Sequence, residues 1–166
     1  RHNARIQYAI RKADCDLFFA TLCDTDLFIC LYSCDRQRLS NYWNDLITKI
    51  PDRNALYAFG QQLIEKQRND KDYLKLLFDF TCFSIDQMGN GEIGFLVAKK
   101  ALSICKEQKG DKQDIVISIN LLIAKSFMMT EDYAKAIQIL DDNIKIYNKE
   151  NKQNDEVVKC HCFKAL

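Results

Sequence analysis

Residues 114–147 read DIVISINLLIAKSFMMTEDYAKAIQILDDNIKIY, and their pattern decides the expected fold. In the second half of this stretch, apolar residues recur at spacings of three and four, which is typical of a helix with one buried face. The residues on that face are Tyr133, Ala136, Ile137, Leu140, Ile144 and Tyr147. The first half is apolar over a broader arc, which indicates a helix packed between neighbours. Between the halves, Thr130-Glu131-Asp132 supplies a hydroxyl and two carboxylates, which favour a helix start. The stretch therefore predicts two helices joined by a turn.

A similar pattern lies 42 residues earlier in the chain. A shift of this length places Asp72-Tyr73-Leu74 on Asp114-Ile115-Val116, and Gly94 on Ala136. In the earlier copy, Gly89-Asn90-Gly91 is expected to make the same turn between helices. Recurrence at a fixed interval is the sequence signature of a repeat array, in which each unit buries its apolar face against the next. We therefore expect stacked pairs of antiparallel helices.

The whole chain fits an all-α array, because one proline and five glycines in 166 residues leave few helix breakers. We expect a single array over residues 1–166, with helices at 37–50, 53–68, 71–88, 92–108, 112–129 and 131–148. These helices form a degenerate pair at 37–68, a repeat at 71–108 and the best repeat at 112–148. An N-terminal helical segment at 1–35, which could break near Asp24, precedes them, and the first helix of a further repeat follows at 154–166. Because that last helix is cut short, we expect the chain to be a fragment of a longer protein.

Charge and apolar patterning argue against two classes of partner. Lys and Arg number 24 and Asp and Glu number 23, so no basic excess is available to bind nucleic acid. The longest apolar stretch, residues 17–34, is interrupted by Asp24 and Asp26 and does not reach the roughly 20 uncharged residues that span a bilayer. We therefore expect neither nucleic acid nor a membrane as the partner.

Eight cysteines lie within apolar helical patterns, without the turn-rich loops of a disulfide scaffold. They are interpreted as buried or half-buried thiols of an intracellular protein, cytoplasmic or nuclear. Cys160-His161-Cys162 cannot place three ligands on one metal, because successive side chains of a helix point about 100° apart. Cys30 and Cys34 lack a second pair at a matching spacing. We therefore predict no metal site.

Catalytic and cofactor-binding patterns are absent from the sequence. A nucleophilic cysteine requires a histidine base, and His2 and His161 lie at the extremities of the chain. Paired carboxylates such as Asp14 with Asp16 are explained by helix starts. Trp43 is interpreted as a core residue, since burial is the usual fate of such rings. We therefore expect no catalytic residue and no cofactor.

One part of the chain resembles the core of a tetratricopeptide repeat, and the resemblance is carried by Ile123-Ala124, Phe127, Tyr133, Ala136-Ile137 and Leu140. That motif has a large residue, a small residue and an aromatic on the first helix, then an aromatic, a small residue and bulky residues on the second. Asn120 departs from it where the family often has Trp, and Asn143 replaces a second small residue. The interval of 42, longer than the usual ~34, is similar to the extended repeats of kinesin-light-chain-like adaptors. The resemblance implies a right-handed α-solenoid whose first helices line a concave groove for peptides or partner helices.

The resemblance also implies which residues line that groove. Chaperone-binding members of the family use Lys, Asn and Arg there to hold a C-terminal carboxylate. The matching places in this chain hold Asp79, Phe80, Phe83, Leu121, Leu122 and Lys125. Because most of these side chains are apolar, we expect a hydrophobic peptide or an amphipathic helix as the ligand.

The expected function is that of a protein-binding scaffold or adaptor within a larger multi-subunit complex, without catalytic activity of its own. An alternative is the helical regulatory arm of a large enzyme whose catalytic domain lies outside this sequence. Packing of the array against copies of itself stays open as well.

Overall fold

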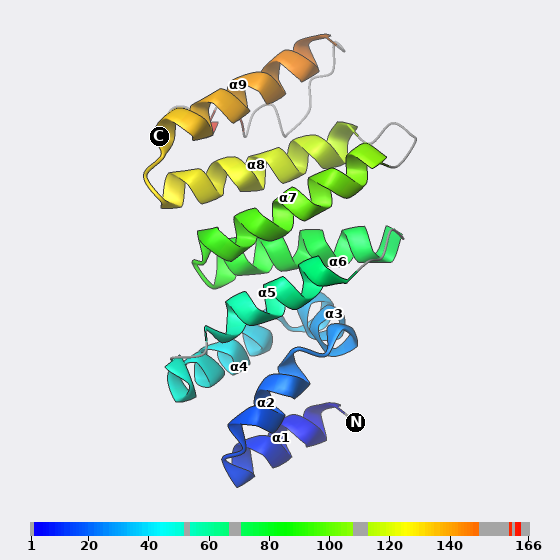
Figure 1. Cartoon of the computed structure of the whole chain (residues 1–166), viewed down its shortest axis with the longest axis vertical. Helices are drawn as coiled ribbons and strands as arrows, with labels where there is room; N and C mark the ends of the chain where they lie inside the picture. The colour runs from blue at the N-terminus through cyan, green and yellow to red at the C-terminus, as the bar shows by residue number, and fades with distance from the viewer. Residues whose placement is uncertain are drawn as a thin grey trace. The chain divides into compact units, whose positions relative to one another are not determined.

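The computed structural model describes residues 2–51, 54–66, 71–107 and 113–149, together with Cys160, Cys162 and Phe163. Within these residues every regular element is helical and no strand is present (Figure 1). The all-α prediction is therefore confirmed. The chain divides into two compact units, Arg1–Gln67 and Arg68–Leu166, which we describe separately as unit 1 and unit 2.

Unit 1 contains the helices α1 (His2–Lys12), α2 (Cys15–Leu22), α3 (Thr25–Cys34), α4 (Arg36–Lys49) and α5 (Ala55–Glu65). Aspartates begin three of them. Asp14 accepts a hydrogen bond from the backbone N–H of Leu17 at 2.9 Å, and Asp24 accepts one from Leu27 at 2.9 Å. Asp35 caps α4 in the same way. The break near Asp24 is thus confirmed, whereas the earlier break at Asp14 was not predicted.

Aromatic rings form the core of unit 1. Trp43 is fully buried and stacks on Phe59, with 5.6 Å between ring centroids. Phe28 contacts Phe59 edge-on at 5.8 Å and stacks on Tyr32 at 5.7 Å. The indole N–H of Trp43 has no hydrogen-bond acceptor among the described residues. The interpretation of Trp43 as a core residue is therefore confirmed.

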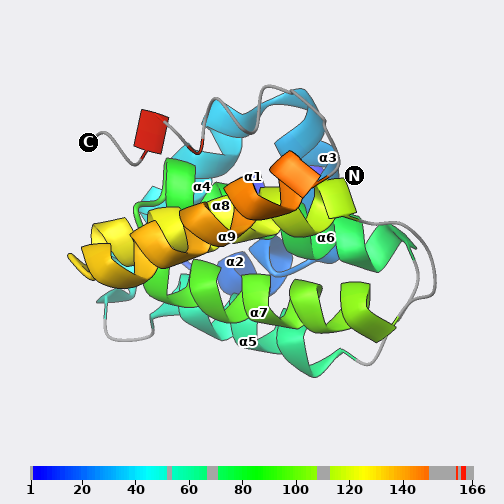
Figure 2. The same ribbon diagram turned by 90° about the horizontal axis from the view of Figure 1, so that it is seen from above.

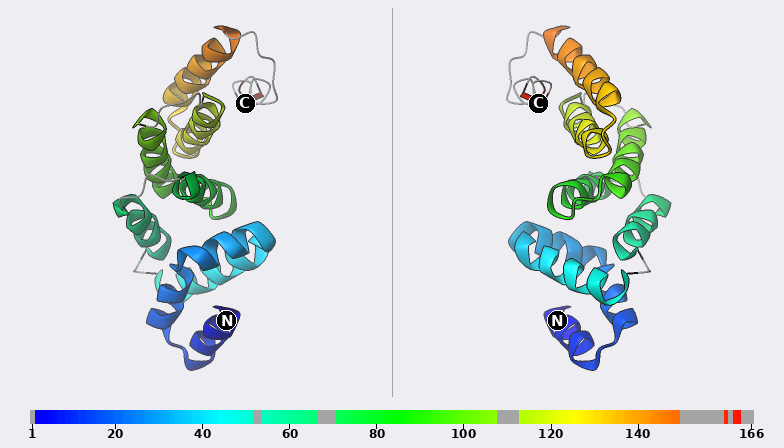
Figure 3. Two further views of the ribbon diagram at one scale, coloured as in Figure 1. Left: turned by 90° about the vertical axis from the view of Figure 1, so that its right-hand side faces the viewer. Right: turned by 90° about the vertical axis from the view of Figure 1, so that its left-hand side faces the viewer.

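Unit 2 contains α6 (Lys71–Cys82), its π-helical continuation η2 (Phe83–Gln87), α7 (Gly91–Glu107), α8 (Gln113–Met129) and α9 (Tyr133–Lys149). Each of these helices packs on the next along the chain, and α6 also contacts α8. Figure 2 views the unit from above, with α9 lying over α8, and Figure 3 shows α6 and α8 to one side of α7. With η2 counted as the end of α6, the described ends of α4 to α9 lie within three residues of the predicted ones.

Helix boundaries in unit 2 recur at an interval of 42 residues. The first helices begin at Lys71 and Gln113, and the second helices begin at Gly91 and Tyr133. The hairpin of α6, η2 and α7 therefore has a counterpart in the hairpin of α8 and α9. The right-handed solenoid and the single array over residues 1–166 stay predictions.

The turns inside the two hairpins share a residue with positive φ and a side-chain cap. Gly89 and Glu131 both have positive φ angles, 63° and 61°. One residue later, Asn90 accepts a hydrogen bond from the backbone N–H of Ile93 at 3.2 Å, and Asp132 accepts one from Lys135 at 3.3 Å. Both second helices therefore begin with an amide or carboxylate cap.

The first helices differ by one residue just before these turns. The backbone N–H of Met88 donates to the carbonyl of Phe83, five residues back, whereas that of Thr130 donates to Ser126, four residues back. The two donor residues, Met88 and Thr130, are therefore 42 positions apart, whereas the two acceptor residues, Phe83 and Ser126, are 43 positions apart. The π-helical turn η2 accommodates the extra residue. Residues of α6 before η2 consequently correspond to α8 residues 43 positions later.

Gly94 lies where α7 crosses η2. A Cβ atom at Gly94 would come within 2.5 Å of Cγ1 of Ile85 and 2.9 Å of Oγ of Ser84, too close for any side chain without movement. At the corresponding place in the second hairpin, Ala136 is buried in a cluster with Ala124 and Leu140. Glycine is therefore required beside the π turn, and alanine fits where the π turn is absent.

Candidate partner-binding face

The six residues predicted to line a groove do not share one exposed surface. Phe80 and Phe83 are 0% exposed, so their rings belong to the core of unit 2. Asp79 and Leu121 are each 8% exposed. The partly exposed members of the set, Leu122 and Lys125, both lie on α8.

The π turn explains this result. The prediction from sequence used the interval of 42 for the whole of α6 and η2. The predicted groove residues of this helix therefore lie one position too far along the chain. With the interval of 43, Asp79 corresponds to Leu122 and Cys82 corresponds to Lys125. Phe80 then corresponds to Ile123, and both of these are core residues.

An outward face of unit 2 follows from the corrected register. Its residues occur at spacings of three and four on each first helix, and apart from Asp79 they are exposed or half-buried. We call this surface the first-helix face, and it comprises Asp72, Lys75, Asp79 and Cys82 on α6 with Ile115, Ser118, Leu122 and Lys125 on α8. The sequence does contain a sign of this face. The spacing of Asp72, Lys75 and Asp79 places these three charged residues on the same side of α6.

The two halves of the first-helix face differ in chemistry. On α8 the face holds two apolar residues, Ile115, which is 40% exposed, and Leu122, which is half-buried, together with Ser118 and Lys125. On α6 it is charged, and Nζ of Lys75 lies 2.6 Å from Oδ2 of Asp79. Lys125 forms an ion pair with Asp86 of η2, which links the two first helices. Two apolar side chains of α8 therefore share this face with the charged side chains of α6.

In the described part of the chain, no group of three or more His, Cys, Asp or Glu side chains could hold a metal ion. Cys160 is buried and Cys162 is exposed, while His161 lies outside the described residues. Cys30 and Cys34 are also exposed. The interpretation of all eight cysteines as buried or half-buried is therefore wrong for Cys30, Cys34 and Cys162.

Cys23 lies half-buried at the C-terminal end of α2. Burial raises the pKa of this thiol to about 12, although the charge of Lys66 partly opposes the shift. A thiol with this pKa stays protonated at neutral pH and is a poor nucleophile. Cys23 is therefore a packing residue at the end of α2.

No single helix in the described ranges is long and apolar enough to cross a membrane. Only α2 and α3 taken together reach the required length and composition, and they are bent by 70° at the break between them.

Comparison with known proteins adds no assignment to this geometry. No protein-family model, no curated protein and no solved structure matches the chain.

Proposed function

We propose that this chain is an intracellular scaffold or adaptor of the tetratricopeptide-like type, which binds a peptide or a partner helix within a larger complex. The observation that carries the proposal is the first-helix face, where apolar side chains of α8 lie beside charged side chains of α6. The matched turns and the interval of 42 residues support the repeat character.

The chemistry of the first-helix face favours an amphipathic ligand. Ile115 and Leu122 lie two helical turns apart, so a ligand helix with apolar residues at i and i+7 can contact both. Asp72 and Asp86 are exposed along the α6 side of the face. Basic residues beside the apolar stripe of the ligand would approach these carboxylates and would raise the association rate more than the affinity.

The π turn adds to the argument. Single π turns inside helices occur frequently at functional sites. Here the turn contains Asp86, whose carboxylate pairs with Lys125 across the two first helices. Because both side chains are about one-third exposed, the pair contributes only about 0.2–1 kcal/mol to stability. A role in shaping the face therefore explains the pair better than a role in holding the fold.

Affinity capture with the complete chain tests the proposal. Wild-type protein is compared with the double variant Ile115→Asp/Leu122→Asp, and the matched control is Ile137→Asp, which replaces an exposed isoleucine on α9. Partners that bind the first-helix face are lost from the double variant and kept by the control. Each variant is first shown to be folded by circular dichroism. If a folded double variant keeps every partner, the first-helix face is not the binding surface.

A further inference from the structure

Two of the exposed cysteines lie one helical turn apart on α3. Cys30 and Cys34 are both exposed, and neither thiol makes a hydrogen bond or an ion pair within the described part of the chain. Cysteine is among the residue types that are most often buried, so two exposed thiols on one side of a helix are unusual. The pair therefore calls for an explanation other than packing.

The rest of α3 holds this pair in a fixed place. The opposite side of the helix carries Phe28 and Tyr32, which are buried and whose rings stack on each other in the core of unit 1. At the C-terminal end, the backbone N–H of Asp35 donates to the carbonyl of Leu31 at 2.7 Å, which closes the last helical turn. The two cysteines therefore keep the spacing of a regular helix, in which Cβ atoms four residues apart are about 5–6 Å from each other.

This separation decides what the two thiols can form. A disulfide requires Cβ atoms about 3.5–4.5 Å apart, so it does not fit an intact α3. A metal ion between the sulfurs keeps them farther apart, because each sulfur bonds to the ion and not to the other sulfur. Thiolate is a soft ligand, which selects copper(I), zinc or iron–sulfur clusters. The spacing therefore favours a bridging metal ion over a disulfide.

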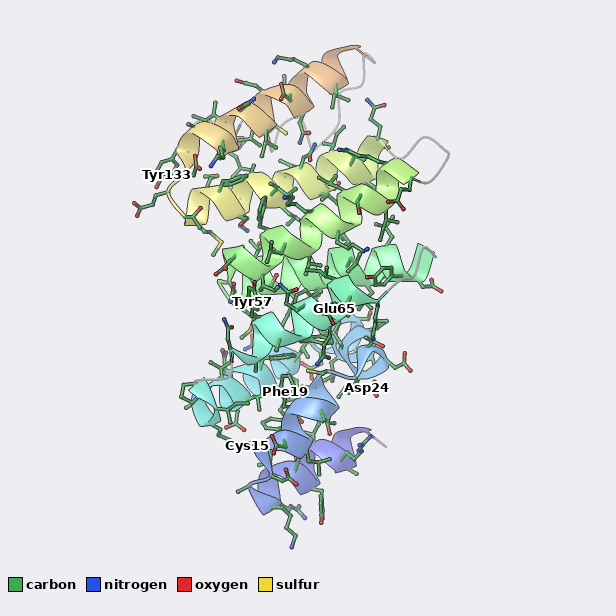
Figure 4. The ribbon with its side chains drawn as sticks, in the orientation of Figure 1. Cys15, Phe19, Asp24, Tyr57, Glu65 and Tyr133 are labelled. Atoms are coloured by element: carbon green, nitrogen blue, oxygen red, sulfur yellow. The ribbon has the colours of Figure 1, made fainter. Side chains whose placement is uncertain are left out.

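The number of ligands then separates these metals. Structural zinc sites and iron–sulfur clusters take four protein ligands. No third His, Cys, Asp or Glu of the described residues joins Cys30 and Cys34 in a metal-binding group. Figure 4 shows Cys15 at the start of α2, with that helix between it and Asp24 at the start of α3. Copper(I) needs no further ligand, because two thiolates on opposite sides of this ion complete its coordination.

We infer that Cys30 and Cys34 bind one copper(I) ion between their sulfurs. Each thiol loses its proton to solvent and each thiolate forms one bond to the ion, so the copper keeps its oxidation state. The prediction of no metal site from sequence considered sites with three or four ligands, whereas two suffice here. The site belongs to unit 1, so it does not depend on the function proposed for the first-helix face of unit 2.

Anaerobic competition for copper(I) tests this inference. The complete, reduced chain is titrated against the coloured copper(I) complex of bicinchoninate, whose absorbance falls as the chain removes the ion. Wild type should bind the first copper(I) ion with one ion per chain. Cys30→Ser and Cys34→Ser should each weaken this binding about a hundredfold or more, because the second thiol of a chelate acts at a high effective concentration. Cys162→Ser removes another exposed thiol and should bind as wild type does.

Moving one thiol along α3 separates chelation from the number of thiols. Asp26 is exposed one helical turn before Cys30. Cys34→Ser/Asp26→Cys restores a pair of thiols four residues apart and should bind the ion as wild type does. Cys30→Ser/Asp26→Cys has the same number of thiols, but they are separated by about 12 Å along the helix, so it should bind as weakly as Cys30→Ser. Circular dichroism first shows that each variant is folded.

Three results would overturn the inference. The first is wild-type affinity for the first copper(I) ion in folded Cys30→Ser or Cys34→Ser. The second is equal affinity of the two variants that contain Asp26→Cys. The third is a copper-dependent dimer in sedimentation velocity with one ion per two chains, because the ion would then join cysteines of different chains.

Discussion

The two hairpins of unit 2 have the same length and similar turns, yet they fill their interiors differently. The α6–α7 hairpin has a π turn and a glycine at its crossing, whereas the α8–α9 hairpin has an unbroken α-helix and an alanine. These differences have one cause, because the extra residue of η2 brings Ile85 against α7 and leaves no room for a side chain at Gly94. The comparison teaches that a repeat interval can be kept at the helix ends while the register inside one helix changes.

A second difference concerns polarity. Asn120 donates from Nδ2 to Oδ1 of Asn143 at 2.9 Å, and Asn143 donates to the carbonyl of Ile117 at 3.2 Å. In the other hairpin the corresponding residues, with the corrected register, are Leu77 and Ala101, both fully buried. The two residues that depart from the tetratricopeptide pattern are therefore hydrogen-bonded to each other. A hydrogen-bonded polar pair in one hairpin thus stands where the other hairpin has two buried apolar residues.

The largest effect on the stability of unit 2 is expected from single-residue deletions, one in each first helix, made as two separate variants. Deletion of Ile85 removes the extra residue and should leave unit 2 folded, since the rest of α6 keeps its orientation. Deletion of Phe127 in α8 should rotate the preceding residues by about 100° and expose Ile117 and Ile123. That variant should lose cooperative unfolding. Urea unfolding followed by circular dichroism measures both.

Gly94 provides the control for this pair of deletions. In the wild type, Gly94→Ala should cost about 1–3 kcal/mol through overpacking against Ile85. In the Ile85 deletion the same change should cost much less, because α7 then faces a regular helix as Ala136 does. Equal costs in both backgrounds would show that η2 is not the reason for the glycine.

A smaller effect is expected from breaking the asparagine pair. Asn143→Ala should destabilise unit 2 by about 1–3 kcal/mol, since it leaves the amide of Asn120 and the carbonyl of Ile117 without their partner. The double variant Asn120→Leu/Asn143→Ala copies the residues of the first hairpin and should recover most of that loss. The free energies of unfolding of the single and double variants decide the point, and additive losses would contradict it.

The smallest effect is expected at the caps of the second helices. A hydrogen bond from Nζ of Lys135 lowers the pKa of Asp132 below its ordinary value of 3.8. The stabilisation from this charge is therefore complete above the pKa of the unfolded chain and is lost as the pH falls through the lower folded value. Asp132→Asn keeps the cap and removes the charge, so its urea midpoint should lie below that of wild type at pH 7. The difference should shrink as the pH falls below 3.8 and should vanish only below the lowered pKa of the folded protein.

Asn90 is the matched control for this cap, because Ile93 stands where the second hairpin has Lys135. Asn90→Asp should therefore change the pH dependence less than Asp132→Asn does. A larger change in the first hairpin would mean that the lysine is not the source of the shift.

Sequence reasoning was most successful where one residue type acts alone. The helices from α4 to α9 could be predicted because Pro51, the polar connectors and the apolar spacings mark their ends locally. Asp24 could be recognised as a break, whereas Asp14 has the same capping role in a stretch that reads as continuously helical. Local signals therefore located most helices and missed one interruption.

The candidate face needed information that the local sequence does not contain. The segment Phe83–Gln87 has no proline or glycine to mark a π turn, and its extra residue is accommodated by a distant glycine, Gly94. Three of the predicted groove residues lie on the first-helix face, and they are Asp79, Leu122 and Lys125. The others, Phe80, Phe83 and Leu121, are core or nearly buried residues one helical position away.

Burial of Trp43 allows the unfolding of unit 1 to be followed separately from the unfolding of the whole chain. It is the only tryptophan in the sequence, and its indole ring lies in the aromatic core of unit 1. Tryptophan fluorescence, excited at the long-wavelength edge of the protein absorption band where tyrosine does not absorb, therefore reports the unfolding of Arg1–Gln67 alone. Far-ultraviolet ellipticity reports the unfolding of both units together. A substitution in either unit can be assigned to its own transition in a single titration, without any added label.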